Sequence, residues 1–270
     1  MRRCVWIVSL VLLVAFAFGP ALATAEEKAE EMVDQGNLVI VEVVTINPDG
    51  LAAYEAASKK MLSVLAEHDF PYGYDAYMTD DYHYMFVYPI KSFGDIDALY
   101  GNWMKLIESW GMDKWDAMQK ELGDAVVSSD LTVFNFRRDL SFLPEDNAYD
   151  GSKPNFVYWG FCKVKPGKEQ ALEEAFKGFV DLWKSKEMTT GWAAYQGFFG
   201  ADMPIYVYAE WGPSPAAFWA QSEKAEARIG DGAKGLWDQT MQSLRSYEFM
   251  TGRNRPDLSY KPAMKEEAEE

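Results

Sequence analysis

The sequence contains 270 residues, with 42 Asp and Glu against 26 Lys and Arg, and its formal net charge is −16 at pH 7. Such an acidic chain is a poor partner for nucleic acid, because that binding depends on Lys and Arg contacting phosphates. An anionic membrane surface would also repel it, so the charge mainly favours solubility.

Residues 1–25 have the pattern of a secretory signal peptide. Arg2 and Arg3 precede an apolar run at residues 5–18, and small residues ending in Ala25 follow. The run is shorter than the ~20 residues that a bilayer-spanning helix needs. We therefore expect cleavage, a periplasmic or secreted protein, and no membrane segment in the mature chain. An uncleaved anchor is the alternative. Cleavage removes Cys4 and leaves Cys162 alone, which excludes a disulfide within one chain.

The rest of the chain contains an internal repeat with a constant offset of 118 residues. Three pairs of segments carry the repeat: 37–48 with 155–166, 73–77 with 191–195, and 139–142 with 257–260. Matches at one offset over this length predict two copies of one domain. We place the copies at residues 37–142 and 155–260, with a polar linker at 143–154. Residues 26–36 and 261–270 are charge-rich and are expected to be loose.

Each copy has the same predicted order of elements. Strands are predicted from runs rich in Val, Ile or aromatic residues, and helices from apolar residues at helical spacing. In the first copy the predicted elements are, in order, strand 38–46, a helix from 51, strands 74–79 and 84–88, helix 92–110 with further turns to 122, and strand 131–136. The second copy repeats it as strand 156–164, helix 169–184, strands 192–196 and 205–211, helices from 215 to 244, and a strand around 247–250. The order is β-α-β-β-α-β, the ferredoxin-like arrangement.

The first strand is apolar on both faces, which predicts how the copies pack. It carries Val39, Val41 and Val43 on one side and Leu38, Ile40, Val44 and Ile46 on the other. A ferredoxin-like sheet has helices on one face only, so the other apolar face needs cover. The predicted fold is therefore α+β, with two tandem ferredoxin-like domains packed sheet to sheet as an intramolecular α+β barrel. Pairing with copies from another chain is the alternative, and the protein is expected to be a monomer or a homodimer.

Several segments of the second copy resemble a known family. Residues 161–169 (FCKVKPGKE), 191–195 (GWAAY) and 206–211 (YVYAEW) are similar to the first three strands of dimeric α+β barrel domains. Members include antibiotic-biosynthesis-monooxygenase-type and NIPSNAP-type domains. The first copy departs from the pattern at residues 47–50 and 89–91. Because these motifs are turns and strand patterns, the resemblance is specific for fold and weak for activity.

Glu42 is the first candidate for a chemical role. It alternates with Ile40 and Val44, so its side chain is expected to point toward the helices, and its counterpart in the second copy is Gly160. A carboxylate in an apolar strand needs a partner or becomes protonated. We interpret it as an acid or base in a pocket between sheet and helices. Pairing with a local hydroxyl is the alternative.

His83 is the second candidate, and it stands where the third strand begins. It has the chemistry of a proton shuttle or a haem ligand, and the alternative is an edge residue that faces water. Some relatives of the family bind or degrade haem. The chlorite dismutase group, which also has two such domains per chain, needs an axial histidine in the second domain, and no histidine follows His83. Two histidines and one mature cysteine make a zinc site an unexpected feature.

Aromatic residues on the strands are the candidate ligand-binding residues. They are Tyr77, Trp159, Phe161, Trp192, Tyr195 and Tyr208. Such rings line pockets for apolar or planar ligands, and they also fill cores.

The sequence thus predicts an exported protein that binds a small apolar or aromatic molecule and needs no cofactor. The resemblance implies one alternative, a cofactor-independent oxygenase of quinol-like or polyketide-like substrates. In it, Glu42 or His83 would take the proton, and Trp159 and Tyr77 would hold the ring. A haem-binding or haem-degrading protein is a further alternative, as is a module without catalysis.

Overall fold

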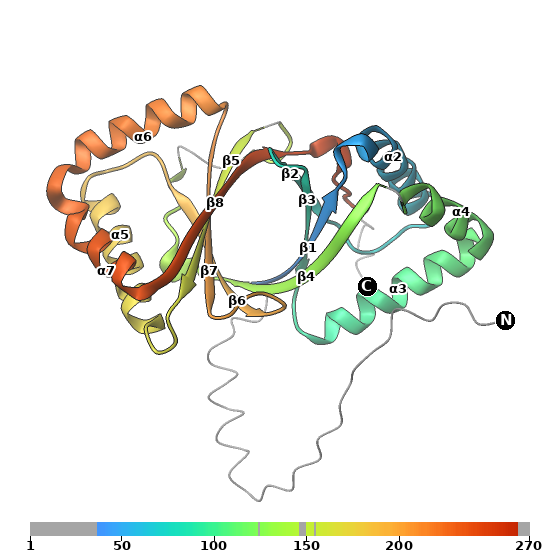
Figure 1. Ribbon diagram of the computed structural model, residues 1–270, viewed down its shortest axis with the longest axis horizontal. Helices are drawn as coiled ribbons and strands as arrows, with labels where there is room; N and C mark the ends of the chain where they lie inside the picture. The colour runs from blue at the N-terminus through green and yellow to red at the C-terminus, as the bar shows by residue number, and fades with distance from the viewer. Residues whose placement is uncertain (1–36, 124, 146–149, 154, 264–270) are drawn as a thin grey trace, which may run out of the picture. The chain divides into compact units, whose positions relative to one another are not determined.

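The computed structural model describes residues 37–123, 125–145, 150–153 and 155–263 of the chain (Figure 1). The predicted signal peptide, the segment 26–36 and most of the tail 261–270 lie outside the described residues. The part of the chain that runs from β1 to β4 is called the first half here, and the part from β5 to β8 the second half.

The two halves have the same order of strands and helices. The first half contains β1 (Leu38–Ile46), α2 (Leu51–Glu67), β2 (Asp75–Thr79), β3 (His83–Ile90), α3 (Gly94–Trp110), α4 (Met112–Leu122) and β4 (Val126–Phe136). The second half contains β5 (Phe156–Val164), α5 (Glu169–Ser185), β6 (Trp192–Phe199), β7 (Ile205–Gly212), α6 (Pro215–Ile229), α7 (Lys234–Ser243) and β8 (Leu244–Asn254). The predicted β-α-β-β-α-β order is confirmed in both.

Local sequence signals set several of these boundaries. The Ser214 hydroxyl accepts a hydrogen bond from the Ala217 N–H at 3.2 Å and caps α6, and Pro215 occupies the first turn. Gly111 separates α3 from α4 with a φ of +111°, a conformation that glycine adopts without a steric penalty. These signals determine where α6 begins and where α3 ends along the chain.

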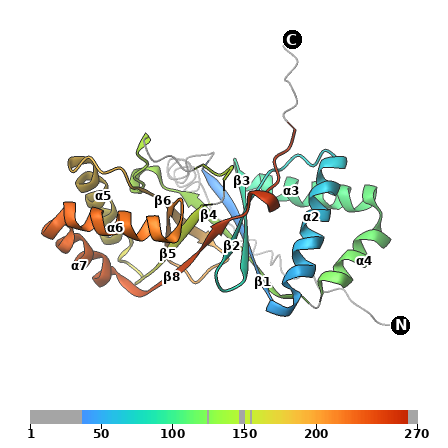
Figure 2. The ribbon, with the colours of Figure 1, turned by 90° about the horizontal axis from the view of Figure 1, so that it is seen from above.

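The described strands form one closed barrel in the order β1-β3-β2-β8-β5-β7-β6-β4. The halves meet at two seams, where β8 pairs with β2 and β4 pairs with β6, both antiparallel. The last strand of each half therefore joins the sheet of the other half. Helices α2, α3 and α4 cover the outer face of one side of the barrel, and α5, α6 and α7 cover the other side (Figure 2). The predicted intramolecular α+β barrel is confirmed.

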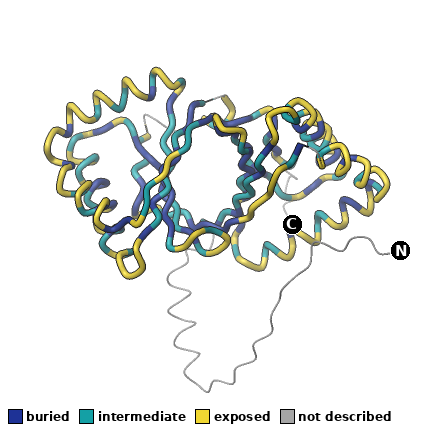
Figure 3. The backbone as a smooth tube through the Cα atoms, viewed as in Figure 1, coloured by how far each residue is buried: buried dark blue, intermediate teal, exposed yellow. Residues whose placement is uncertain are grey.

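Both faces of β1 are covered, as its two-sided apolar pattern predicts. Val39, Val41 and Val43 pack against the cluster inside the barrel, which includes Trp159 and Val207. Leu38, Ile40, Val44 and Ile46 face the helices and are buried. Figure 3 shows that exposed residues concentrate on the outer helices and loops, while the strands are largely buried or half-buried.

Strands β4 and β8 extend furthest beyond the ranges that their sequence patterns predict. Strand β4 begins at Val126 and not at Leu131, and β8 spans Leu244–Asn254 and not only residues 247–250. The first part of β4 is mostly exposed and polar, but its backbone pairs with β1. Backbone pairing needs no hydrophobic alternation, so side-chain periodicity misses these ends.

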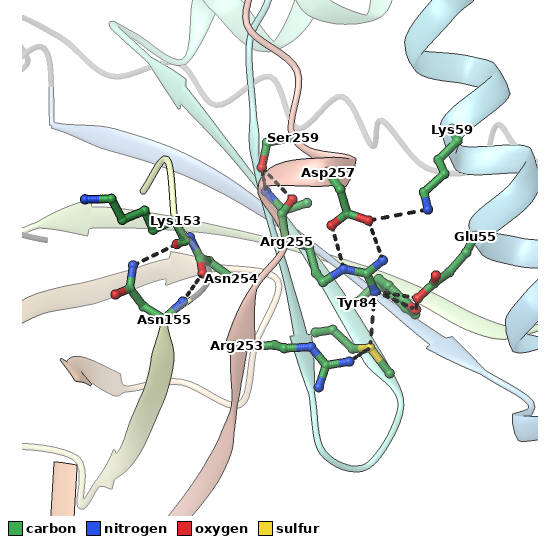
Figure 4. A network of polar contacts seen from close by, with 12 residues as sticks. Glu55, Lys59, Tyr84, Lys153, Asn155, Arg253, Asn254, Arg255, Asp257 and Ser259 are labelled. Atoms are coloured by element: carbon green, nitrogen blue, oxygen red, sulfur yellow. Dashed lines mark hydrogen bonds and ion pairs between the residues drawn. The ribbon is translucent and has the colours of Figure 1, made fainter. Parts of the chain in front are cut away.

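An arginine ties each seam to a helix of the opposite half, and it is buried at one seam and half-buried at the other. Arg255, which follows β8, donates two 2.8 Å hydrogen bonds to the Asp257 carboxylate, and it forms an ion pair with Glu55 on α2 (Figure 4). The Tyr84 hydroxyl donates to the same Glu55 carboxylate at 2.6 Å. The contact links the end of the second half to the first helix of the first half.

The same contacts recur at the other seam. Arg137, which follows β4, donates to Asp139 at 2.9 Å and to Glu173 on α5 at 2.7 Å. The Tyr206 hydroxyl donates to Glu173 at 2.5 Å. Both arginines are thus paired with carboxylates, one on a helix of the opposite half and one just after the seam strand.

Candidate functional site

A cavity of about 400 Å³ lies between the outer face of the first-half sheet and helices α2, α3 and α4. Its wall is apolar and aromatic except at a few positions. The main lining residues are Ile40, Val44, Tyr54, Ala57, Met61, Tyr74, Phe86, Tyr88, Leu99, Tyr100, Trp103, Trp115, Met118 and Leu131, together with Glu42.

Glu42 supplies the one carboxylate among the described lining residues of this cavity. Strand alternation places it on the helix-facing side of β1 with Ile40 and Val44, and its neighbours across the sheet are Phe86 and Leu131. The Ser129 hydroxyl donates a hydrogen bond to the Glu42 carboxylate at 2.9 Å. Burial raises the pKa of Glu42, and the hydrogen bond from Ser129 opposes this rise. Glu42 thus lies in a pocket and also has a local hydroxyl partner, and its role as an acid or base stays a prediction.

Four tyrosines surround the carboxylate from different elements. They are Tyr54, Tyr74, Tyr88 and Tyr100. Burial raises the pKa of each of them, and the negative charge of Glu42 raises it further. The phenols therefore remain protonated donors at neutral pH. The hydroxyls of Tyr74 and Tyr88 make no hydrogen bond to another described residue, so they are open to a ligand.

The equivalent space in the second half is filled. Gly160 stands where Glu42 stands in the first half, and a Cβ placed on it would lie 2.3 Å from Cζ of Tyr208. The Tyr208 hydroxyl shares a 2.6 Å hydrogen bond with the Tyr247 hydroxyl, which also bonds Tyr158 at 2.7 Å. The ring of Tyr208 occupies the volume, so the Glu42 cavity has no twin at this position.

The predicted aromatic ligand residues lie elsewhere. Tyr77, Trp159, Phe161 and Tyr195 belong to the cluster inside the barrel, whereas Trp192 and Tyr208 belong to the helix-side core of the second half. None of the six lines the Glu42 cavity. The structure therefore does not bring them together with Glu42.

Sequence reasoning missed Tyr54, Tyr100 and Trp103, which lie on the cavity-facing sides of α2 and α3. Their helical spacing is visible in the sequence. The same spacing describes a filled core, however, so it gives no signal for a cavity.

His83 lies away from the cavity. Its Nδ1 atom is 3.0 Å from the Asp81 carboxylate at the β2–β3 turn, and its side chain is 25% exposed. His68, at the end of α2, has its Nδ1 atom 3.0 Å from the Ser109 hydroxyl. Neither histidine lines the Glu42 cavity. The histidines therefore do not fit the role of an axial haem ligand there.

Three further findings concern the described residues only. They contain no cluster of His, Cys, Asp and Glu that could hold a metal ion. None of their helices combines the length and apolar character required to cross a bilayer. Cys162 is a buried free thiol, and burial raises its pKa to about 12.

Comparison with known proteins finds solved structures with a similar fold. No protein-family model matches the sequence, and no curated protein matches it significantly. Among solved structures, an anthrone oxidase-like protein is similar with a TM-score of 0.58 and 13% identity, over 82% of this chain and 92% of the other. A candidate monooxygenase from Lactobacillus acidophilus has a TM-score of 0.50 and 10% identity, over 83% and 96%.

A variant of chlorite dismutase from Candidatus Nitrospira defluvii is also similar, with a TM-score of 0.51 and 12% identity, over 85% of this chain and 96% of the other. At such low identity these likenesses concern the fold, and they span nearly the whole of each similar chain. They confirm the predicted resemblance at that level: the chain has the fold of an α+β barrel, and both ferredoxin-like halves lie on one polypeptide.

Proposed function

We propose that the Glu42 cavity binds a small, ring-shaped, mainly apolar molecule that presents a hydroxyl or another hydrogen-bond donor to Glu42. The observation that carries this proposal is a half-buried carboxylate in a largely apolar and aromatic cavity, whose hydrogen-bond partner among the described residues is the Ser129 hydroxyl. The volume of about 400 Å³ falls in the range of roughly 300–1,000 Å³ that is usual for small-molecule sites.

The polar groups of the cavity support a ligand with both donor and acceptor groups. Glu42 accepts one hydrogen bond from Ser129, and a carboxylate has room for more. Tyr74 and Tyr88 offer hydroxyls that no described residue uses. A planar molecule with a hydroxyl on one edge and a carbonyl on another matches this arrangement, while its rings contact the aromatic walls.

The cavity has a mouth to which both halves contribute. Tyr100, Leu131 and Phe199 line the cavity and are 52%, 44% and 49% exposed. Phe199 belongs to β6 of the second half, and its ring contacts Phe93 at a centroid distance of 5.9 Å. Exposed large apolar side chains at a cavity are a feature of ligand-binding sites, so these residues form the proposed entry for an apolar ligand.

Binding is tested with 2-naphthol and with 2-methoxynaphthalene, which lacks the donor, by isothermal titration calorimetry. We expect 2-naphthol to bind more tightly. Glu42→Gln should lower the affinity for 2-naphthol roughly fivefold to tenfold, because a charge-assisted hydrogen bond becomes a neutral one. The affinity for 2-methoxynaphthalene should not change.

Glu121→Gln, on the exposed side of α4, is the matched control. Leu99→Trp fills the cavity and should weaken both probes. Equal binding of 2-naphthol to the parent and to Glu42→Gln would contradict the proposal.

A second candidate function is oxidation of such a ligand by O2 without a cofactor. The position of Glu42 favours it, because a carboxylate whose pKa is raised by burial is a better base than an exposed one. Glu42 would remove a proton from an acidic ring carbon or hydroxyl. The resulting anion can then reduce O2.

The name of one structural neighbour suggests anthrone as the probe. Proton loss from its methylene carbon and reaction with one O2 give one anthraquinone and one water, so the carbon is oxidised and oxygen is reduced. We expect O2 uptake with the parent protein, and a loss of about a hundredfold or more in Glu42→Gln, as for removal of a general base. Anthrone binding without O2 uptake would limit the function to binding.

We further propose that the protein acts in the periplasm or outside the cell. This rests on the sequence pattern of residues 1–25 alone. N-terminal sequencing of the protein from a periplasmic fraction tests it, and a mature chain that begins near Glu26 is the expected result. An intact Met1 would contradict cleavage.

A further inference from the structure

The second half contains a cavity of its own, of about 440 Å³, between β7 and helices α5, α6 and α7. No described residue lines both this cavity and the Glu42 cavity. Its lining combines aromatic residues with several charged residues, whereas Glu42 is the one charged residue among the described residues that line the first cavity. The aromatic members are Trp183, Trp211, Phe218 and Trp237, the acidic members are Glu210, Glu226 and Asp231, and the basic member is Lys234.

Glu210 is the unusual member of this lining. It lies on β7, opposite Tyr158 on one neighbouring strand and Trp192 on the other. Its carboxylate has no hydrogen bond or ion pair with another described residue, and burial raises its pKa to about 7. By contrast, the half-buried carboxylates of Glu55 and Glu173 each bind an arginine and a tyrosine.

An unpaired, partly dehydrated carboxylate is a costly feature. A ligand that brings a positive charge or a donor to Glu210 would offset that cost.

The charge around the cavity favours a cation. The Lys234 ammonium is 2.6 Å from the Asp238 carboxylate on the next turn of α7, so its charge is already compensated. Glu210, Glu226 and Asp231 then leave the lining net negative. An anion would be repelled, and a purely apolar ligand would leave Glu210 without a partner.

The aromatic walls suit the same kind of ligand. Trp183 contacts Trp192 edge-on at a centroid distance of 5.4 Å, and Trp237 contacts Phe179 at 5.0 Å. These contacts hold the two indoles in place before a ligand arrives. Indole faces attract cations, and aromatic walls are the usual surroundings of bound quaternary ammonium groups.

We propose that the second cavity binds a small organic ammonium ion, with Glu210 as the counter-ion and Trp183 and Trp237 as cation–π walls. This site is separate from the Glu42 cavity and does not depend on the function proposed for it. The protein would then bind two different ligands, a mainly apolar one in the first half and a cationic one in the second half.

The test measures the affinities of the whole protein for choline and for 3,3-dimethylbutan-1-ol by isothermal titration calorimetry. The alcohol is a neutral molecule of the same shape as choline. We expect choline to bind at least about tenfold more tightly than the alcohol. Glu210→Gln should lower choline affinity about tenfold and leave the alcohol unchanged. Glu223→Gln, exposed on α6 and outside the lining, is the matched control and should bind both as the parent does.

Trp237→Leu is a second variant that keeps the apolar surface and removes the indole. Trp237 is 43% exposed, so the substitution should not disturb folding. We expect it to abolish most of the preference for choline over the alcohol. Equal affinities of the parent for the two probes, no choline binding, or unchanged choline binding in both variants would each overturn the proposal.

Discussion

Replacing Glu210 by Gln removes a charge that the folded protein holds without a described partner. The variant should therefore be more stable than the parent at alkaline pH. The ordinary pKa of the side chain is 4.5, and burial raises it to about 7 in the folded state. Between these values the folded protein keeps a proton that the unfolded chain has lost. The parent must then lose stability as the pH rises from 4.5 to 7, and the loss is complete above pH 7.

The size of the effect follows from the two pKa values. One pKa unit corresponds to about 1.4 kcal/mol, so the rise to about 7 sets a ceiling of about 3 kcal/mol. Glu210 is half-buried and lines a cavity. Solvent screening lowers the expected gain of the variant to about 1–2 kcal/mol at pH 8.

Urea unfolding of the parent and of Glu210→Gln at pH 5 and pH 8 measures this difference. At pH 5 the folded parent is already protonated at Glu210, so the two proteins should have similar free energies of unfolding. Other titrating groups act equally in both proteins and cancel. Those nearest to Glu210 are Tyr208, Tyr158, Glu226, Asp231 and Lys234. Glu223→Gln should give a difference that does not vary with pH. A less stable Glu210→Gln at pH 8 would refute the reasoning, since it would reveal a favourable partner of the carboxylate.

Three further substitutions and one chemical reaction test the packing. Gly160→Ala should cost about 1–3 kcal/mol in the free energy of unfolding, because its Cβ would meet the Tyr208 ring; urea denaturation measures the loss, and an unchanged midpoint would show that the ring moves freely. Arg255→Met should cost about 2–3 kcal/mol, because it leaves the half-buried Glu55 carboxylate without its arginine. Arg137→Met should cost the same, since its contacts are equivalent, and a large inequality would contradict that equivalence. Cys162, whose pKa is about 12, should resist iodoacetamide at pH 8 until urea is added, and fast labelling of the native protein would show local opening.

The fold was readable from the sequence because its signals are periodic. Alternation in residues 38–46 predicts two covered faces of β1, and the repeat at offset 118 predicts a second sheet to cover one of them. The same alternation places Glu42 toward the helices, where the structure has it. Strand ends such as Ser128 and Ser129 escape prediction, because backbone pairing there carries no apolar pattern.

The cavities were not readable because they depend on volume. The Tyr208 ring fills the space beside Gly160 in the second half, whereas the equivalent space beside Glu42 and Phe86 in the first half is part of a cavity. Nothing in the local pattern of either strand distinguishes a ring that fills a core from a ring that lines a cavity. Glu210 escaped notice for a related reason: its missing partner becomes visible only when the surrounding helices are in place.

The two seams also determine when the barrel can close during synthesis. The β2–β8 seam joins residues such as Tyr77 and Asn254, which lie at nearly opposite ends of the described chain. Contacts of such sequence separation form late and slow folding. The barrel face of Val39, Val41 and Val43 in the first half therefore stays open until strands of the second half pair with it. We expect the chain to need protection from aggregation before that pairing is complete, because β8, the last strand among the described residues, is the one that closes the ring.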